Sequence, residues 1–149
     1  MRLLLNHGIN MEAEDILGMT ALYMAAQLGA ADMVRTLTSH GASVNSGLNG
    51  EWTPLHMAAS KGHTGVVQAL VENQAEIDAT SAPGYTALLM AAGNGHIDTV
   101  KLLAESGANL ELRDNKGKTA LDAAVEQGKH EVVDFLREKC TSGHNTNKE

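Results

Sequence analysis

Hydrophobic residues recur along this chain with a period of 33 residues. Valine occupies one repeated position, at Val34, Val67, Val100 and Val133. Leucine occupies another, at Leu4, Leu37, Leu70, Leu103 and Leu136. In the period that begins near residue 48, Val66, Val67 and Leu70 follow the spacing of one helix face, which predicts a helix over about residues 64–72. A pattern kept over several periods predicts a chain built of similar units.

A polar residue followed by an apolar run opens a short segment in each period. The segments TALYMAA, TPLHMAA, TALLMAA and TALDAAV begin at Thr20, Thr53, Thr86 and Thr119. Threonine caps helix N-termini, and Pro54 suits the first helical position, where a missing N–H costs nothing. We therefore expect a short alanine-rich helix, about residues 54–60 in the second full unit. It should end at Gly62, because glycine adopts the left-handed backbone most easily.

The rest of each period is polar and carries turn residues. Pro83 and Gly84 suit a tight turn, as does the sequence DNKG at 114–117. Neither helix of one unit can bury its apolar face alone, so the units must stack side by side. The pattern predicts a solenoid of helix pairs.

The period and the stretch TPLHMAASKGHTGVVQALV from Thr53 make the chain similar to the ankyrin repeat family. The resemblance covers about residues 1–140. It implies an all-α ankyrin-repeat solenoid, in which helix-turn-helix units carry β-turn or hairpin fingers. Gln74 replaces the usual glycine after a second helix, so we expect a strained exit there. Glu51 takes the place of a turn glycine, so we expect an altered turn in that finger.

The repeat register divides the chain into five units and a tail. We expect a truncated repeat at 1–14, with only a second helix and its exit loop, followed by full repeats at 15–47, 48–80 and 81–113. A C-terminal capping repeat at 114–140 and a disordered polar tail at 141–149 complete the division. The truncated first unit suggests a fragment of a longer array, and a natural chain with a frayed first unit is the alternative.

Composition and charge narrow the classes of partner. The net charge is −7, and lysine and arginine form no cluster, which argues against nucleic acid. The longest apolar run near the start, in MRLLLNHG, is interrupted by Asn6 and His7 and is far short of a membrane-spanning segment. Cys140 is the only cysteine, so no disulfide forms within the chain, which fits a reducing compartment. We expect a cytoplasmic monomer, with a nuclear location as an alternative.

His56 and Ser60 lie four residues apart on one predicted helix and invite comparison with a catalytic pair. A hydrolase would also need an orienting carboxylate and an oxyanion site, and nothing like a nucleophile elbow surrounds Ser60. The resemblance instead gives His56 a structural hydrogen bond to neighbouring backbone. We expect no enzyme activity and no cofactor.

His63 and His96 occupy the same position in adjacent repeats, and the expected distance between them is too long for them to share a metal ion. Helices in contact lie about 8–10 Å apart, whereas two ligands of one zinc lie no more than about 4 Å apart. We therefore expect no metal site.

Function should lie at repeat positions that packing leaves free. The position before each threonine holds Met19, Trp52, Tyr85 and Lys118, and the resemblance places it on the finger, facing the concave side. Because lysine fills the same place, packing does not require the two aromatic residues. The alternative is that they only cover the finger bases. The candidate partner-binding residues are Leu17, Met19, Gln27, Leu28, Trp52, Ser60, Lys61, Tyr85, Asn94 and Lys118.

These features favour a non-enzymatic protein-interaction module, part of a larger protein, that binds its partner on the concave face and the finger tips. Unit 48–80 is the most acidic, with Glu51, Glu72, Glu76 and Asp78 against Lys61 alone. We therefore expect a protein partner with an apolar anchor and a basic rim. The alternatives are a regulatory inhibitor that docks on an enzyme such as a kinase, a targeting arm of a larger enzyme or channel, and a structural spacer.

Overall fold

The computed structural model describes residues 21–45 and 52–148, with side chains up to residue 139. Within these residues the chain forms helices in pairs. The first helices of the pairs are α2 (Ala21–Leu28), α4 (Pro54–Lys61), α6 (Ala87–Asn94) and α8 (Ala120–Glu126). The second helices are α3 (Ala31–Ser39), α5 (Thr64–Glu72), α7 (Ile97–Glu105) and α9 (His130–Lys148).

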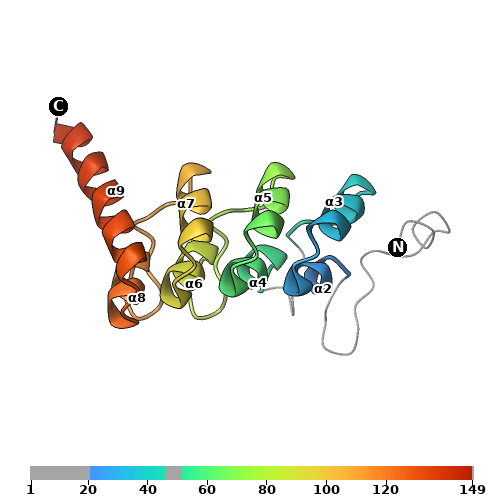
Figure 1. Cartoon of the computed structure of the whole chain (residues 1–149), viewed down its shortest axis with the longest axis horizontal. Helices are drawn as coiled ribbons and strands as arrows, with labels where there is room; N and C mark the ends of the chain where they lie inside the picture. Colours follow the sequence, from blue (N-terminus) through green and yellow to red (C-terminus); the bar gives the residue numbers. More distant parts are fainter. Residues whose placement is uncertain (1–20, 46–51, 149) are drawn as a thin grey trace.

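The helices form two layers. In Figure 1 the first helices stand side by side in one row and the second helices in the other, with the units following one another along the long axis. Each helix therefore contacts its own partner and the equivalent helices of the adjacent units. The predicted solenoid of helix pairs is confirmed.

Threonine side chains fix where the first helices begin. Thr53 Oγ1 accepts a hydrogen bond from the His56 N–H at 3.3 Å. Thr86 and Thr119 cap α6 and α8 in the same way. These hydrogen bonds satisfy N–H groups that have no partner within the helix, as the sequence predicted.

Glycine at the end of a first helix meets two demands. Gly62 ends α4 with φ of 73°, and Gly95 ends α6 with φ of 77°. A Cβ atom at Gly62 would also lie 2.6 Å from Nδ1 of His96 in the next unit. The left-handed backbone and the close neighbour both favour glycine.

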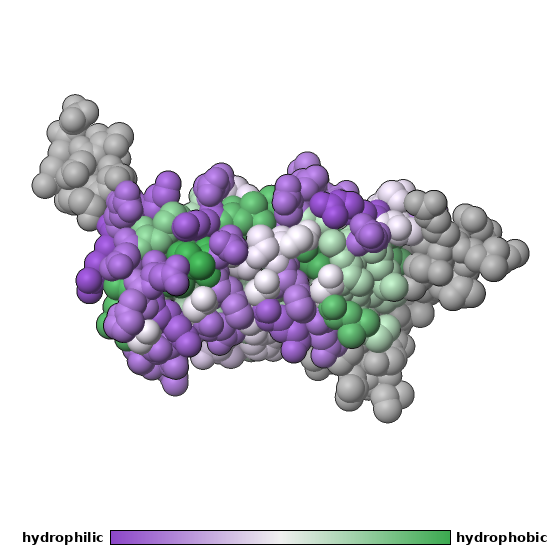
Figure 2. Space-filling model, viewed as in Figure 1, coloured by the Kyte–Doolittle hydropathy of each residue, from purple (hydrophilic) through white to green (hydrophobic). Residues whose placement is uncertain are grey.

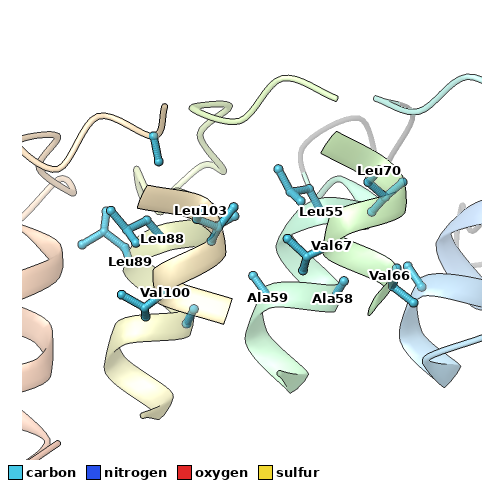
Figure 3. Packing of buried hydrophobic residues seen from close by; sticks show 14 of the residues in the cluster. Leu55, Ala58, Ala59, Val66, Val67, Leu70, Leu88, Leu89, Val100 and Leu103 are labelled. Carbon is cyan, nitrogen blue, oxygen red and sulfur yellow. The ribbon is translucent and has the colours of Figure 1, made fainter. Parts of the chain in front are cut away.

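The core lies between the two layers. Alanine pairs such as Ala58 and Ala59 are fully buried, and their small side chains let the first helices approach closely. Leucine and valine from the second helices, such as Val67 and Leu70, complete the packing (Figure 3). The buried residues form one cluster that runs through the described units.

The exit from α5 is strained, as the sequence predicted. Gln74 has φ of 73°, whereas the equivalent Gly41 and Gly107 have φ of 92° and 98°. A left-handed backbone is costly for a residue with a Cβ atom.

The loops that follow the second helices also join the units. Asn45 Oδ1 accepts from the Glu76 N–H at 2.9 Å, and Asp78 Oδ1 accepts from the Asn109 N–H at 3.0 Å. Asn45 and Asp78 occupy the same repeat position, so the same short polar side chain contact recurs from unit to unit.

The C-terminal segment differs from the expected disordered tail at 141–149. Helix α9 continues to Lys148, well past residue 140. No proline interrupts this stretch, and the single Gly143 costs a helix only about 1 kcal/mol, so the packed part of α9 propagates the helix. The predicted repeat at 1–14 and the altered turn at Glu51 lie outside the described residues.

No helix in residues 21–45 and 52–148 is both long and apolar enough to cross a membrane.

Candidate interaction surface

The segments before α6 and α8, here called the α6 finger (residues 81–85) and the α8 finger (residues 114–118), are tight turns. The Ser81 N–H donates to the Tyr85 carbonyl at 3.0 Å, and the Asp114 N–H donates to the Lys118 carbonyl at 2.9 Å. The described residues contain no β-strand, so these fingers are β-turns rather than extended hairpins.

Asp114 holds the α8 finger with its side chain. Its Oδ1 accepts from the N–H groups of Lys116 at 2.8 Å and Lys118 at 3.0 Å. The hydrogen bond from the Lys118 N–H is the main cause that lowers the pKa of Asp114. The finger therefore presents an ionised carboxylate beside two lysines.

Adjacent fingers contact each other directly. The Asn115 N–H donates to the Pro83 carbonyl at 3.0 Å, and Asn115 Nδ2 donates to the Ala82 carbonyl at 2.8 Å. A Cβ atom at Gly84 would lie 2.7 Å from Asn115 Oδ1, so this approach requires glycine. The two fingers form one continuous edge.

Trp52, which precedes α4 as Tyr85 precedes α6, is a neighbour of Tyr85. Their ring centroids are 6.5 Å apart, with an interplanar angle of 57°. Trp52 also meets His56 edge to face at 5.7 Å. Both aromatic residues are half-buried, so part of each remains accessible to solvent.

His56 ties α4 to the next finger. Its Nδ1 lies 3.2 Å from the Thr53 N–H donor, and its Nε2 lies 2.8 Å from the Tyr85 carbonyl oxygen. A backbone N–H only donates and a carbonyl only accepts, so the neutral ring carries its proton on Nε2. Burial is the main cause that lowers the pKa of His56.

The ends of the first helices are joined through polar side chains. Asn94 Nδ2 donates to the Ser60 carbonyl at 2.9 Å, and His96 Nε2 lies 2.9 Å from the same oxygen. In the preceding unit His63 Nε2 lies 3.2 Å from the Gln27 carbonyl. These contacts satisfy carbonyl groups that the helix end leaves without a partner.

A pocket of about 380 Å³ opens between α6, α8 and the α8 finger. Tyr85, Met90, Gly93 and Ala123 line it with apolar groups. At its edge Lys118 forms an ion pair with Glu126, and this hydrogen bond is the main cause that raises the pKa of Lys118.

Large apolar side chains are exposed at the other end of the described array. Leu28 is 76% exposed and Met24 is 40% exposed. In the view of Figure 2, hydrophobic residues are scattered among hydrophilic ones rather than gathered into one large patch. Binding through such a surface would depend on a few local anchors.

A family model described as ankyrin repeats (3 copies) matches the chain over residues 1–81 and 75–149. The chain belongs to the ankyrin repeat family. Ankyrin repeats are generally protein–protein interaction modules and typically have no enzyme activity. No curated protein matches this chain.

The ankyrin array brings together only part of the predicted binding set. Tyr85 and Lys118 lie on the two fingers, Trp52 lies beside Tyr85 just before α4, and Tyr85 shares the pocket with Lys118 and Asn94. Leu28 and Lys61 are exposed at the ends of α2 and α4, while Gln27 and Ser60 are half-buried beside them. Leu17 and Met19 lie outside the described residues.

The pocket itself was missed by the sequence reading. Ala123 occupies the repeat position that holds Met24, Met57 and Met90 in the other units. Gly93 occupies the position that holds Gln27, Ser60 and Glu126. Comparing side chain size along these two positions would have indicated a hollow between α6 and α8.

The array already uses two of the carboxylates on which the expected basic rim depended. Glu72 forms an ion pair with Arg35 at 3.7 Å, and Asp78 accepts from the Asn109 N–H. The basic rim stays a prediction.

The residues considered for chemistry have structural contacts. Both ring nitrogens of His56 are engaged, and the side chain is 1% exposed. His63 and His96 each contact a carbonyl of the preceding unit. Among the described side chains no group of three or more histidine, cysteine, aspartate or glutamate residues could hold a metal ion.

Proposed function

We propose that this chain is a non-enzymatic interaction module that binds a protein partner along the fingers and the adjacent ends of the first helices. One observation carries the proposal. Trp52 and Tyr85 are neighbouring half-buried rings at a repeat position where the next unit has Lys118. Packing of the unit therefore does not require an aromatic residue there, whereas aromatic residues are common anchors of protein interfaces.

Rigid placement supports this role for the two rings. Trp52 directly precedes the N-cap Thr53, and Tyr85 directly precedes the N-cap Thr86. The backbone of Tyr85 is held by Ser81 on one side and by His56 on the other. Because the backbone that carries the ring is already ordered, binding costs entropy only for the side chain torsions.

Site-specific photo-crosslinking tests which face binds. Photoreactive residues at Lys61 and Gln127 would report on the finger side, and one at Gln68, exposed on α5, would report on the second-helix side. We expect the partner to be captured by crosslinks from positions Lys61 and Gln127 and not from Gln68. Crosslinks only from 68 would reject the proposed face.

Trp52→Ala tests the anchor. We expect binding to the captured partner to weaken by about 2 kcal/mol, or roughly 30-fold in Kd, measured by calorimetry. The substitution also removes the Trp52 contact with His56, so the melting temperature should fall somewhat.

Phe135→Ala is the matched control for Trp52→Ala. Phe135 is another half-buried ring, on α9, with Lys101 Nζ 5.9 Å and Lys139 Nζ 5.6 Å from its centroid. Its removal should lower stability and leave the affinity unchanged. Equal affinity losses for both variants would mean that the Trp52 effect is one of stability alone.

A cytoplasmic location, the monomeric state and membership of a larger protein belong to the same proposal. The cytoplasmic location rests on the single Cys140, which fits a reducing compartment, and the other two parts rest on the family resemblance. Light scattering at micromolar concentration would test the monomer.

A further inference from the structure

The pocket beside Tyr85 exists because two repeat positions carry unusually small residues. Ala123 stands where the other units have methionine, and Gly93 stands where they have glutamine, serine or glutamate. A Cβ atom built on Gly93 would lie 3.8 Å from the Ala123 Cβ, an ordinary contact distance. The glycine is therefore not needed for helix packing, and its absence of a side chain leaves the hollow open.

The lining of the pocket suits a flat ring. Gly93 has no side chain and Ala123 has a single methyl group, so the floor that they form between α6 and α8 carries no large side chain. Tyr85 supplies an aromatic ring, and Met90 supplies a thioether, which makes favourable contacts with aromatic rings.

The charges around the pocket balance. Asp114 and Glu126 contribute two carboxylates, and Lys116 and Lys118 contribute two ammonium groups. Lys118 and Glu126 already neutralise each other through their ion pair. With two charges of each sign, the rim offers no net attraction to a cation or an anion, and it matches a neutral occupant.

We infer that this pocket binds a neutral aromatic side chain, tryptophan or tyrosine, of the protein partner. The inference rests on the proposed interaction function and names the group that the partner inserts. Tyr85 connects the pocket with the proposed anchor Trp52. Its ring lies 6.5 Å from that of Trp52, and Tyr85 also lines the pocket. The partner's ring extends the row of aromatic side chains beyond Tyr85.

Blocked amino acid amides, three of them neutral and one cationic, test the inference without knowledge of the partner. N-acetyl-tryptophanamide, N-acetyl-tyrosinamide, N-acetyl-leucinamide and N-acetyl-argininamide are each titrated into the ¹⁵N-labelled full chain up to about 20 mM. We expect the two aromatic amides to shift the amide resonances of Gly93, Asn94, Ala123 and Gln127 with millimolar affinity. Their affinity should change less than about twofold between low and high salt, because a neutral ligand is not screened.

Two substitutions fill the pocket without disturbing the fold. Ala123→Met introduces the residue that the other units carry at this position, and it should abolish the shifts. Gly93→Ala adds one methyl group to the floor and should weaken aromatic binding at least threefold. Because alanine favours a helix over glycine, Gly93→Ala should leave the melting temperature unchanged or raised.

Gly65→Ala is the matched control. Gly65 is a helical glycine of α5, and a Cβ atom there would lie 3.7 Å from the Ala31 Cβ, nearly the same spacing as at Gly93. This variant should bind the aromatic amides as the unmodified chain does.

Three outcomes would overturn the inference. These are no shifts with the aromatic amides, equal shifts with N-acetyl-leucinamide, and stronger binding of N-acetyl-argininamide. None of them touches the proposed function, which the Trp52→Ala affinity and the crosslinks test separately. Loss of partner binding in Trp52→Ala with no aromatic binding in the pocket would reject the inference alone.

Discussion

Gln74 shows how a single residue departs from the repeat. Among the described residues it is the only one other than glycine with a positive φ, at 73°. The equivalent glycines, Gly41 and Gly107, have nothing within 4 Å of a built Cβ atom. The strain at Gln74 therefore comes from its own backbone and not from a crowded neighbour.

Gln74→Gly is expected to stabilise the protein by about 0.5–1 kcal/mol. Relief of the left-handed conformation outweighs the greater chain entropy that glycine loses on folding. Urea unfolding measures the difference in free energy. Gln68→Gly, at an exposed site within α5, is the control and should destabilise by about 1 kcal/mol. A loss of stability at both sites would contradict the strain.

Polar contacts connect the helices and fingers of adjacent units, and the sequence indicated only some of these contacts. His56 connects α4 to the backbone of the next finger, as the family resemblance implied. The contacts of His63, Asn94 and His96 with carbonyl groups of the preceding unit were not foreseen. Their partners are backbone atoms about one repeat away, which no local pattern of side chains reveals.

The buried His56 should make stability depend on pH. Its pKa is lowered in the folded state from an ordinary value of 6.5, chiefly by burial. Between the two pKa values the unfolded chain binds more protons, so the free energy of unfolding rises with pH there. The contribution is fully present above about pH 6.5 and is lost as the pH falls below it.

Urea unfolding between pH 5 and pH 8 would measure this dependence. His56→Gln serves as the reference, since it removes this ring and keeps every other titrating group. The difference in unfolding free energy between the two proteins should shrink as the pH falls from about 6.5. A difference that stays constant over this range would argue against the lowered pKa.

At the scale of the molecule, the described units are held together by contacts between neighbours. The first-helix row packs through alanines that are fully buried, such as Ala58 in α4 and Ala91 in α6. Side chains of this size set the spacing between units. Each unit buries apolar residues against the next, so its stability depends on its neighbours.

Ala91→Leu should destabilise the array by about 1–3 kcal/mol, because the added atoms force α6 away from its neighbours α4 and α8. Thermal and urea unfolding followed by circular dichroism would measure the loss. Ala104→Leu, at a half-buried position of α7, should change stability by less than about 0.5 kcal/mol. Similar losses at both sites would show that close packing of the first helices is not the limiting contact.

Much of this architecture follows from the sequence alone. The positions of Thr53, Pro54 and Gly62 predicted the bounds of α4 to within one residue, because helix caps are local interactions. The repeated valines and leucines predicted the shared core, and the departure at Gln74 predicted the strained exit.

Other features were decided only by the tertiary structure. The pocket between α6 and α8 depends on the missing side chains of Gly93 and Ala123, which lie thirty residues apart and meet only when the units stack. The closeness of Trp52 to Tyr85 and the carbonyl contacts of His96 likewise arise between units. Local caps and hydrophobic periodicity in the sequence determine the helices of each unit. The space left between units depends on the packing of side chains that are distant in the sequence.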